Sequence, residues 1–200
     1  MANVNRPFGL KPVSYLNGAP YNGQARLYSV AVGNGTALYV GDPVTLSGTA
    51  DTTGIAGVSI GVAGSAVIGV IVGVVVASAG VSLVGSTIDL TRRSLPVSTA
   101  GYVMVADDPN LIFEIQDGVV AGTALTDIGQ NVDFLIAAGG KTFSDSGTTT
   151  ATTVAGTATC NLKLLGFVQR EDNTPASQYA KLLVKINNHV YNAHTGTASI

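Results

Sequence analysis

One long stretch of the chain, residues 52–88, contains no ionisable side chain, and it limits the possible folds more than any other feature. It is longer than the roughly 20 residues that a membrane-spanning helix needs. Gly57 and Gly61 within it have the small-residue spacing by which such helices pack closely. A transmembrane span is therefore one interpretation of this stretch.

The order of residues inside the stretch favours buried strands instead. Valine and glycine dominate, and apolar side chains alternate with a period of two residues, as in a β-strand. The two predicted faces are Ile68, Val70, Val72, Val74 and Val76 on one side and Val67, Gly69, Ile71, Gly73 and Val75 on the other. We expect a strand buried on one face, with Gly69 and Gly73 where a neighbouring backbone lies too close for a side chain. This interpretation predicts no membrane contact.

Period-two patterns recur elsewhere between clusters of Gly, Asn, Asp and Pro. They predict strands over residues 24–32, 36–40, 111–115, 157–164 and 180–186. We expect residues 33–35 to join the first two strands as a hairpin. A strand over residues 39–46 should be interrupted at Gly41-Asp42-Pro43, because proline donates no ladder hydrogen bond.

Helical spacing is not sustained over any window of a dozen residues, and at most one helical turn is expected within residues 121–130. The sequence therefore predicts an all-β fold. We expect a mainly antiparallel β-barrel or sandwich over residues 24–190, followed by an extended C-terminal tail at residues 191–200.

Composition argues against several classes of protein. Charged residues make up 11% of the chain and apolar residues 46%, which is the opposite of the balance in disordered chains. The net charge is −2 and the one adjacent basic pair is Arg92-Arg93, so we expect no nucleic-acid binding. The lone cysteine, Cys160, cannot form an intrachain disulfide or a cysteine-based metal site, and we expect it to be buried. The start of the chain has no signal-peptide pattern, so we expect assembly in a reducing cytoplasm.

Side chains suited to catalysis or metal binding are scarce. His189 and His194 lie in the last dozen residues, where we expect polar tail contacts rather than a catalytic site. The densest group of oxygen ligands consists of Asp107, Asp108, Asn110 and Asp117. Calcium accepts such ligands, but Asp-Asp-Pro-Asn is also an ordinary turn, which we favour. We therefore expect no enzyme activity, no cofactor and no metal.

The first 23 residues differ from the rest of the chain. Prolines, which fix φ and lack a backbone donor, are interspersed with Asn-Gly turns, so no regular element is expected over residues 1–23. The segment is too apolar for a solvated tail. We expect an extended arm that binds a partner surface through Phe8, Leu10, Lys11, Tyr15, Leu16 and Tyr21.

Several short motifs carry a resemblance to a known family. They are residues 1–12 with residues 16–23, residues 106–115, Arg170-Glu171-Asp172-Asn173 and Lys185-Ile186-Asn187-Asn188-His189. They resemble the head decoration, or cement, proteins of tailed bacteriophages. The third motif by itself predicts a solvated turn, or else ion pairs to a neighbouring subunit.

The resemblance implies a virion structural protein on the capsid surface, assembled in the host cytoplasm. Its partner would be the major capsid protein, and its own state a homo-oligomer, most commonly a trimer. A second interpretation remains open: a receptor-facing fibre or tail-surface module, in which the Thr-rich residues 144–159 bind a host ligand.

Overall fold

The computed structural model describes residues 3–76, 93–136 and 146–192, and in these ranges the protein is all-β, as the sequence predicts. The described strands are β1 (Lys11–Tyr15), β2 (Arg26–Val30), β3 (Leu38–Tyr39), β4 (Pro43–Ala50), β5 (Ala56–Ile60), β6 (Gly69–Val76), β7 (Ser94–Leu95), β8 (Gly101–Ala106), β9 (Leu111–Gln116), β10 (Asn131–Leu135), β11 (Thr149–Ala155), β12 (Leu162–Phe167) and β13 (Lys181–Ile186). A single turn of 3-10 helix, η1 (Leu125–Asp127), falls where one turn is expected. No helix within these ranges is long and apolar enough to cross a membrane.

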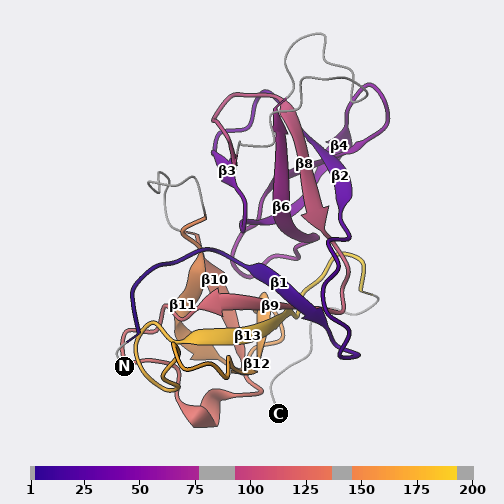
Figure 1. Ribbon diagram of the computed structural model, residues 1–200. Coiled ribbons are helices and arrows are strands. Elements are labelled where there is room, and N and C mark those ends of the chain that lie inside the picture. The colour runs from indigo at the N-terminus through magenta and orange to yellow at the C-terminus, as the bar shows by residue number, and fades with distance from the viewer. Residues whose placement is uncertain (1–2, 77–92, 137–145, 193–200) are drawn as a thin grey trace.

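The strands form two units, one above the other in Figure 1. The lower one, which we call the sheet unit, is an antiparallel six-stranded sheet in the order β1-β9-β13-β12-β10-β11. Alternation is clear in β13, as predicted: Leu182, Val184 and Ile186 are buried, whereas Lys181, Leu183 and Lys185 are partly exposed. The alternation places one apolar row of each strand in a common core.

The upper one, which we call the barrel unit, is a closed barrel in the order β2-β5-β4-β6-β8, with the short pair β3-β7 beside it. Its pairings are antiparallel except for one parallel contact between β2 and β5. Valine and isoleucine dominate its core. Small β-branched side chains suit strands and fill the narrow interior of a barrel with few strands.

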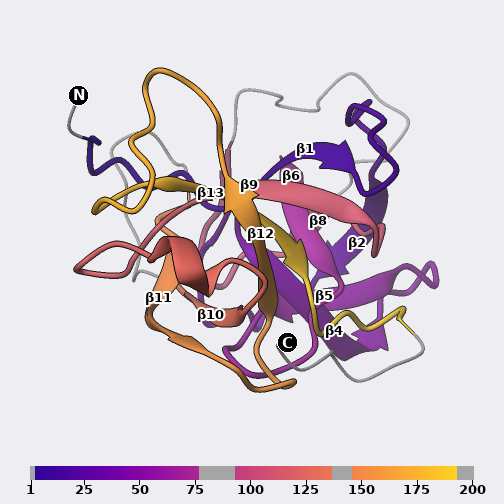
Figure 2. The same ribbon diagram turned by 90° about the horizontal axis from the view of Figure 1, so that it is seen from below.

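Strand β6 lies where the two units meet, as the views in Figures 1 and 2 agree. Val70 and the preceding Val67 belong to the core of the sheet unit, whereas Ile68 and Ile71 belong to the core of the barrel. The predicted strand with a single buried face is therefore wrong. A register shift against β8 between Ile71 and Gly73 also breaks the two-residue period.

The two glycines of β6 have different surroundings. A Cβ atom at Gly69 would lie 2.3 Å from the carbonyl oxygen of Ala106, so a side chain does not fit there, as predicted. A Cβ atom at Gly73 would meet Met104 Cβ at 3.5 Å, which is an ordinary contact. The predicted crowding at Gly73 is wrong, because this residue follows the register shift and faces a side chain rather than a backbone.

Residues 33–35 turn the chain but do not make the predicted hairpin. Both edges of β2 are occupied, by β5 and β8, and β3 pairs with β7. The chain therefore leaves the barrel after β2. By contrast, the predicted interruption is confirmed at Gly41 and Asp42, between β3 and β4. It is wrong at Pro43, which is the first residue of β4 and pairs with Val70 of β6.

The N-terminal segment contains a strand, contrary to the prediction of an arm without regular structure. Strand β1 pairs with β9 at one edge of the sheet unit. Pro12 is tolerated there because it lies at the edge of the six-stranded sheet and beside a register shift, two places where sheets accept proline. Leu10, just before β1, is 1% exposed and packs in the core of the sheet unit. The N-terminal segment is thus part of the fold.

Cys160 is buried, as predicted. The strand predicted over residues 157–164 starts later, at Leu162 in β12. Residues 157–160 form a turn instead, in which the Cys160 N–H donates to the Thr157 carbonyl.

Candidate functional site

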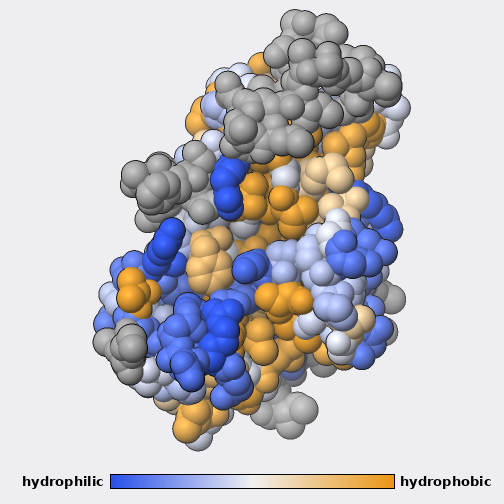
Figure 3. Space-filling model, in the orientation of Figure 1, coloured by the Kyte–Doolittle hydropathy of each residue, from blue (hydrophilic) through white to orange (hydrophobic). Residues whose placement is uncertain are grey.

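A groove of about 910 Å³ lies beside the N-terminal segment, between the two units. Figure 3 shows this face, where apolar surface gathers between the barrel unit and the sheet unit with hydrophilic side chains next to it. The apolar side chains lining the groove are Val4, Phe8, Leu10, Val40, Ile71 and Val72. Its charged side chains are Arg6, Lys11, Arg93, Glu114, Arg170, Asp172 and Lys181.

Close backbone contacts hold the N-terminal segment against the barrel. The Leu10 N–H donates to the Gly41 carbonyl at 2.8 Å. Gly9 and Gly41 both have positive φ, +76° and +97°, and a Cβ atom at Gly9 would lie 2.5 Å from the Gly41 carbonyl oxygen. Glycine is required at this crossing, since any side chain would push the two segments apart.

Polar side chains anchor the start of the segment to the sheet unit. The Arg6 N–H donates to Gln116 Oε1 at 2.7 Å, and Gln116 Nε2 donates to Asn5 Oδ1 at 2.9 Å. Asn3 exchanges hydrogen bonds with the backbone of Thr174, at 3.0 Å and 2.8 Å. The segment therefore has a fixed path along the groove.

The structure brings together four of the six predicted arm residues. Phe8, Leu10, Lys11 and Tyr21 line the groove; Leu10 is buried and contributes to its floor, while Lys11 is exposed. Tyr15 and Leu16 lie apart, in a smaller hollow of about 410 Å³ with Asn17, Asp108 and Asn110. Leu16 is 54% exposed and Tyr15 is half-buried.

Ion pairs occupy the sheet side of the groove. Arg170 binds the buried Glu114 with both terminal nitrogens, at 3.0 Å and 2.7 Å. Arg170 Nε and Lys181 Nζ also bind Asp172. The hydrogen bond to Glu114 raises the pKa of Arg170, and the hydrogen bond from Lys181 lowers the pKa of Asp172. The predicted turn is present, with Arg170, Glu171 and Asp172 exposed, and its ion pairs are made to its own chain.

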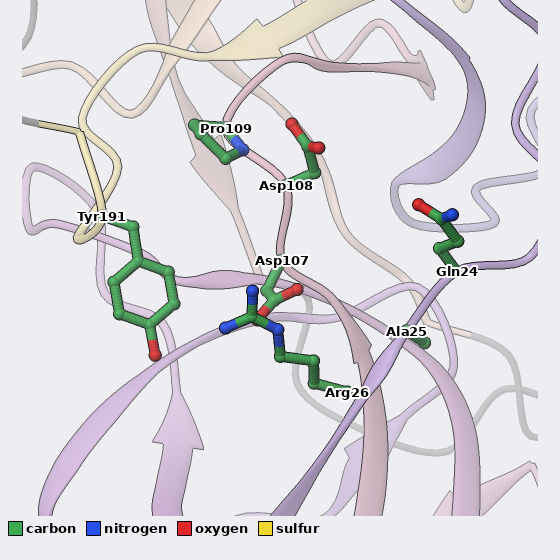
Figure 4. Close-up of a pocket in the computed structure, with 7 residues that line it drawn as sticks. All are labelled: Gln24, Ala25, Arg26, Asp107, Asp108, Pro109 and Tyr191. Carbon is green, nitrogen blue, oxygen red and sulfur yellow. The ribbon is translucent and has the colours of Figure 1, made fainter.

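A second hollow, of about 440 Å³, lies where β2, the chain after β8 and Tyr191 meet (Figure 4). The Asp107 carboxylate accepts a hydrogen bond from the Tyr28 hydroxyl at 2.7 Å and lies 3.4 Å from Arg26 Nε. The Tyr28 hydroxyl is also 3.2 Å from the Tyr191 hydroxyl. Burial and these hydrogen bonds raise the pKa of Tyr28, which keeps the phenol protonated. The network fastens the C-terminal segment to the barrel.

The oxygen-ligand group of the sequence is dispersed in the structure. Asp107 takes part in the network just described, and Asp108 Oδ1 accepts the Asn110 N–H at 2.7 Å, which is the predicted turn. Asp117 accepts the N–H groups of Val119 and Thr123 instead. No cluster of His, Cys, Asp or Glu that could hold a metal occurs within the described ranges.

His189 is buried, contrary to the predicted tail contact, and His194 lies outside the described residues. A parallel bridge joins His189 to Val67, so the segment after β13 runs beside the start of β6. His189 Nδ1 accepts the Tyr191 N–H at 3.0 Å. His189 therefore serves packing between the two units.

Sequence reasoning missed the barrel side of the groove. Val40, Gly41, Ile71 and Val72 come from the segment after β3 and from β6, far along the chain from the N-terminal segment. The one available signal was Gly41 before Asp42-Pro43, which marked a break in a strand but not its neighbour in space. Comparison of the chain with models of protein families, with curated proteins and with solved structures finds no match.

Proposed function

We propose that this protein is a virion structural protein that decorates and stabilises a bacteriophage capsid, and that the groove beside the N-terminal segment is its attachment surface. The partner is the major capsid protein. The role is mechanical, with no catalytic step and no cofactor. The sequence motifs support this proposal by their resemblance to head decoration proteins.

One structural observation carries the proposal furthest: the N-terminal segment is fixed along an open groove whose lining is both apolar and charged. A concave surface with apolar side chains at its centre and charged ones at its rim is typical of protein interfaces. Val4 is 75% exposed at this groove, on backbone that is anchored nearby at Arg6. Contact with a capsid subunit would bury it.

A homo-oligomer, most simply a trimer, would place several copies of this groove around one axis and so multiply weak contacts. The alternative, a host-binding module that uses residues 144–159, has less support. Residues 144–145 lie outside the described ranges, Thr148 and Thr150 are buried, and residues 149–155 form β11. Thr153, Thr157 and Thr159 are exposed, so only part of this segment is available to a host ligand.

The experiment is co-sedimentation with purified heads that lack this protein, using two matched variants. Val4→Asp places a charge in the groove, and Val120→Asp places one at a similarly exposed valine that does not line it. Because a charge buried without a partner is costly, Val4→Asp should weaken head binding about tenfold or more, and Val120→Asp should not. Equal binding by the two variants would overturn the groove as attachment surface. Failure of the unmodified protein to bind any head would overturn the capsid role.

A further inference from the structure

Positive charge is concentrated at the groove, although the whole chain is slightly negative. Five of the ten Lys and Arg residues line it, but only two of the twelve Asp and Glu residues. The net charge of the chain is −2. An excess of cations at one surface of an acidic protein attracts partners of opposite charge and orients them on approach.

The two carboxylates at the groove are already engaged. Glu114 is held by Arg170 in a two-pronged pair, and Asp172 is bound by Arg170 and Lys181. On the sheet side, the charges of Arg170 and Lys181 are therefore balanced by those of Glu114 and Asp172. The positive excess therefore lies with Arg6 and Lys11, which come from the N-terminal segment.

Arg6 and Lys11 are both exposed, and neither side chain makes an ion pair within the described ranges. The Arg6 backbone is nevertheless fixed by Gln116, and Lys11 is the first residue of β1. Their charges are thus carried on anchored backbone, so a bound anion would not have to order a loose tail.

The floor between these cations is apolar. Ile71 is fully buried, Phe8, Val40 and Val72 are partly exposed, and all four line the groove. A floor of this kind takes up aliphatic or aromatic side chains, whereas a purely polyanionic ligand such as nucleic acid would leave it unused. The occupant should therefore carry apolar groups beside its negative charges.

The backbone edge of β1 is closed to a partner strand. Within the segment, the Tyr21 N–H donates to the Val13 carbonyl at 3.1 Å and the Tyr15 N–H to the Ala19 carbonyl at 2.8 Å. Pro12 has no N–H to offer. Recognition at the groove must then come from side chains. An extended partner chain is not bound there through its backbone alone.

We propose that the groove binds a segment of a partner polypeptide in which acidic side chains stand next to apolar ones. The carboxylates pair with Arg6 and Lys11 at the rim, and the apolar side chains rest on Phe8, Val40 and Val72. This inference concerns the chemistry of the occupant and stands whether or not the partner is a capsid protein.

Fluorescence anisotropy with labelled probes tests it on the full chain. The first probe is a short fluorescein-labelled peptide in which Asp and Leu alternate, the second has Lys in place of Asp, and the third is a labelled DNA duplex. We expect only the Asp-Leu peptide to bind, and its affinity to fall as salt is raised because exposed charges are screened.

Two lysines provide a matched pair of variants. Lys11→Glu reverses a charge at the groove, and Lys185→Glu makes the same change on β13, outside the groove. Lys11→Glu should weaken binding of the Asp-Leu peptide about tenfold or more, while Lys185→Glu should change it less than about twofold. Arg6→Glu, at another exposed site, should repeat the Lys11→Glu result.

Three outcomes would overturn the inference. They are equal loss from Lys11→Glu and Lys185→Glu, binding of the Lys-Leu peptide as tight as that of the Asp-Leu peptide, and tighter binding of DNA at the same groove. Peptide binding without head binding would retain this inference and reject the capsid role. Head binding that Lys11→Glu does not change would retain the capsid role and reject this inference.

Discussion

The sheet unit and the barrel unit draw their cores from the chain in different ways. Apolar side chains of the barrel core come almost entirely from one continuous stretch, Tyr28 to Val105. The sheet core instead combines Leu10 with residues 67–70, 106–134 and 162–186. The barrel is thus inserted in sequence between β1 and β9, two strands that pair in the sheet unit. The sheet unit therefore needs both ends of the described chain.

Side-chain size follows the same division. Three phenylalanines, Phe113, Phe134 and Phe167, fill the sheet core, whereas the barrel core is mainly valine and isoleucine. An open sheet leaves room for aromatic rings, while a closed barrel of few strands favours small residues. The N-terminal segment is therefore a structural part of the sheet unit. Its outward side is the part available to a partner.

The largest expected effect concerns Leu10, and it tests whether the sheet unit needs the N-terminal segment for its stability. Leu10→Ala should lower the free energy of unfolding by about 2–5 kcal/mol, since the side chain is buried in the sheet core. Leu16→Ala, at an exposed position of the same segment, should change it by less than about 0.5 kcal/mol. Urea denaturation measures both. Equal stability of the two variants would mean that the segment is a detachable arm.

A smaller effect is expected inside the barrel, where it separates the crowded Gly69 from Gly73, which has room for a methyl group. Gly69→Ala should cost about 1–3 kcal/mol, because the added methyl group meets the backbone of Ala106. Gly73→Ala should cost less than about 0.5 kcal/mol, since its new methyl group makes an ordinary contact. Thermal unfolding of the two variants checks the difference. If Gly73→Ala proved the more damaging, the register of β6 would be wrong.

The smallest effect arises at His189, between the two units. Burial lowers the pKa of His189 from its usual 6.5, although Asp107 and Asp108 partly oppose the shift. Below about pH 6.5 the unfolded chain binds a proton that the folded chain resists, so stability should fall as the pH drops through this range. Melting temperatures between pH 7.5 and about pH 5 measure the slope. His189→Asn should flatten it, and an unchanged slope would contradict the assignment.

The sequence predicted the all-β class and, in the sheet unit, the strands β9 and β13, because apolar side chains alternate along both. It missed β1 and β10 of the same sheet. It failed at β6, where Val67 and Val70 face one core and Ile68 and Ile71 the other. A strand that is buried on both sides loses its contrast between faces, and the register shift removes its period.

For the candidate site, the residue types of the N-terminal segment were informative but its structure was not. Pro12 indicated that no strand forms here. Local propensity could not show that β9 has a free edge at which a strand containing proline can pair. The barrel side of the groove could not be predicted from the sequence for a related reason. Gly41 and Gly9 meet through tertiary packing, and no local pattern marks two glycines that approach each other across the chain.

Hydrogen–deuterium exchange of the free protein tests most directly whether the N-terminal segment is built into the sheet unit. The N–H groups of Leu10, Tyr15, Leu16 and Tyr21 all donate to backbone carbonyls. We predict that peptides covering residues 8–21 exchange as slowly as those covering β9, since protection reflects the stability of the unit to which an amide belongs. Complete exchange of residues 8–21 while β9 stays protected would contradict the account, because the segment would then be a loose arm and the groove would have no fixed wall.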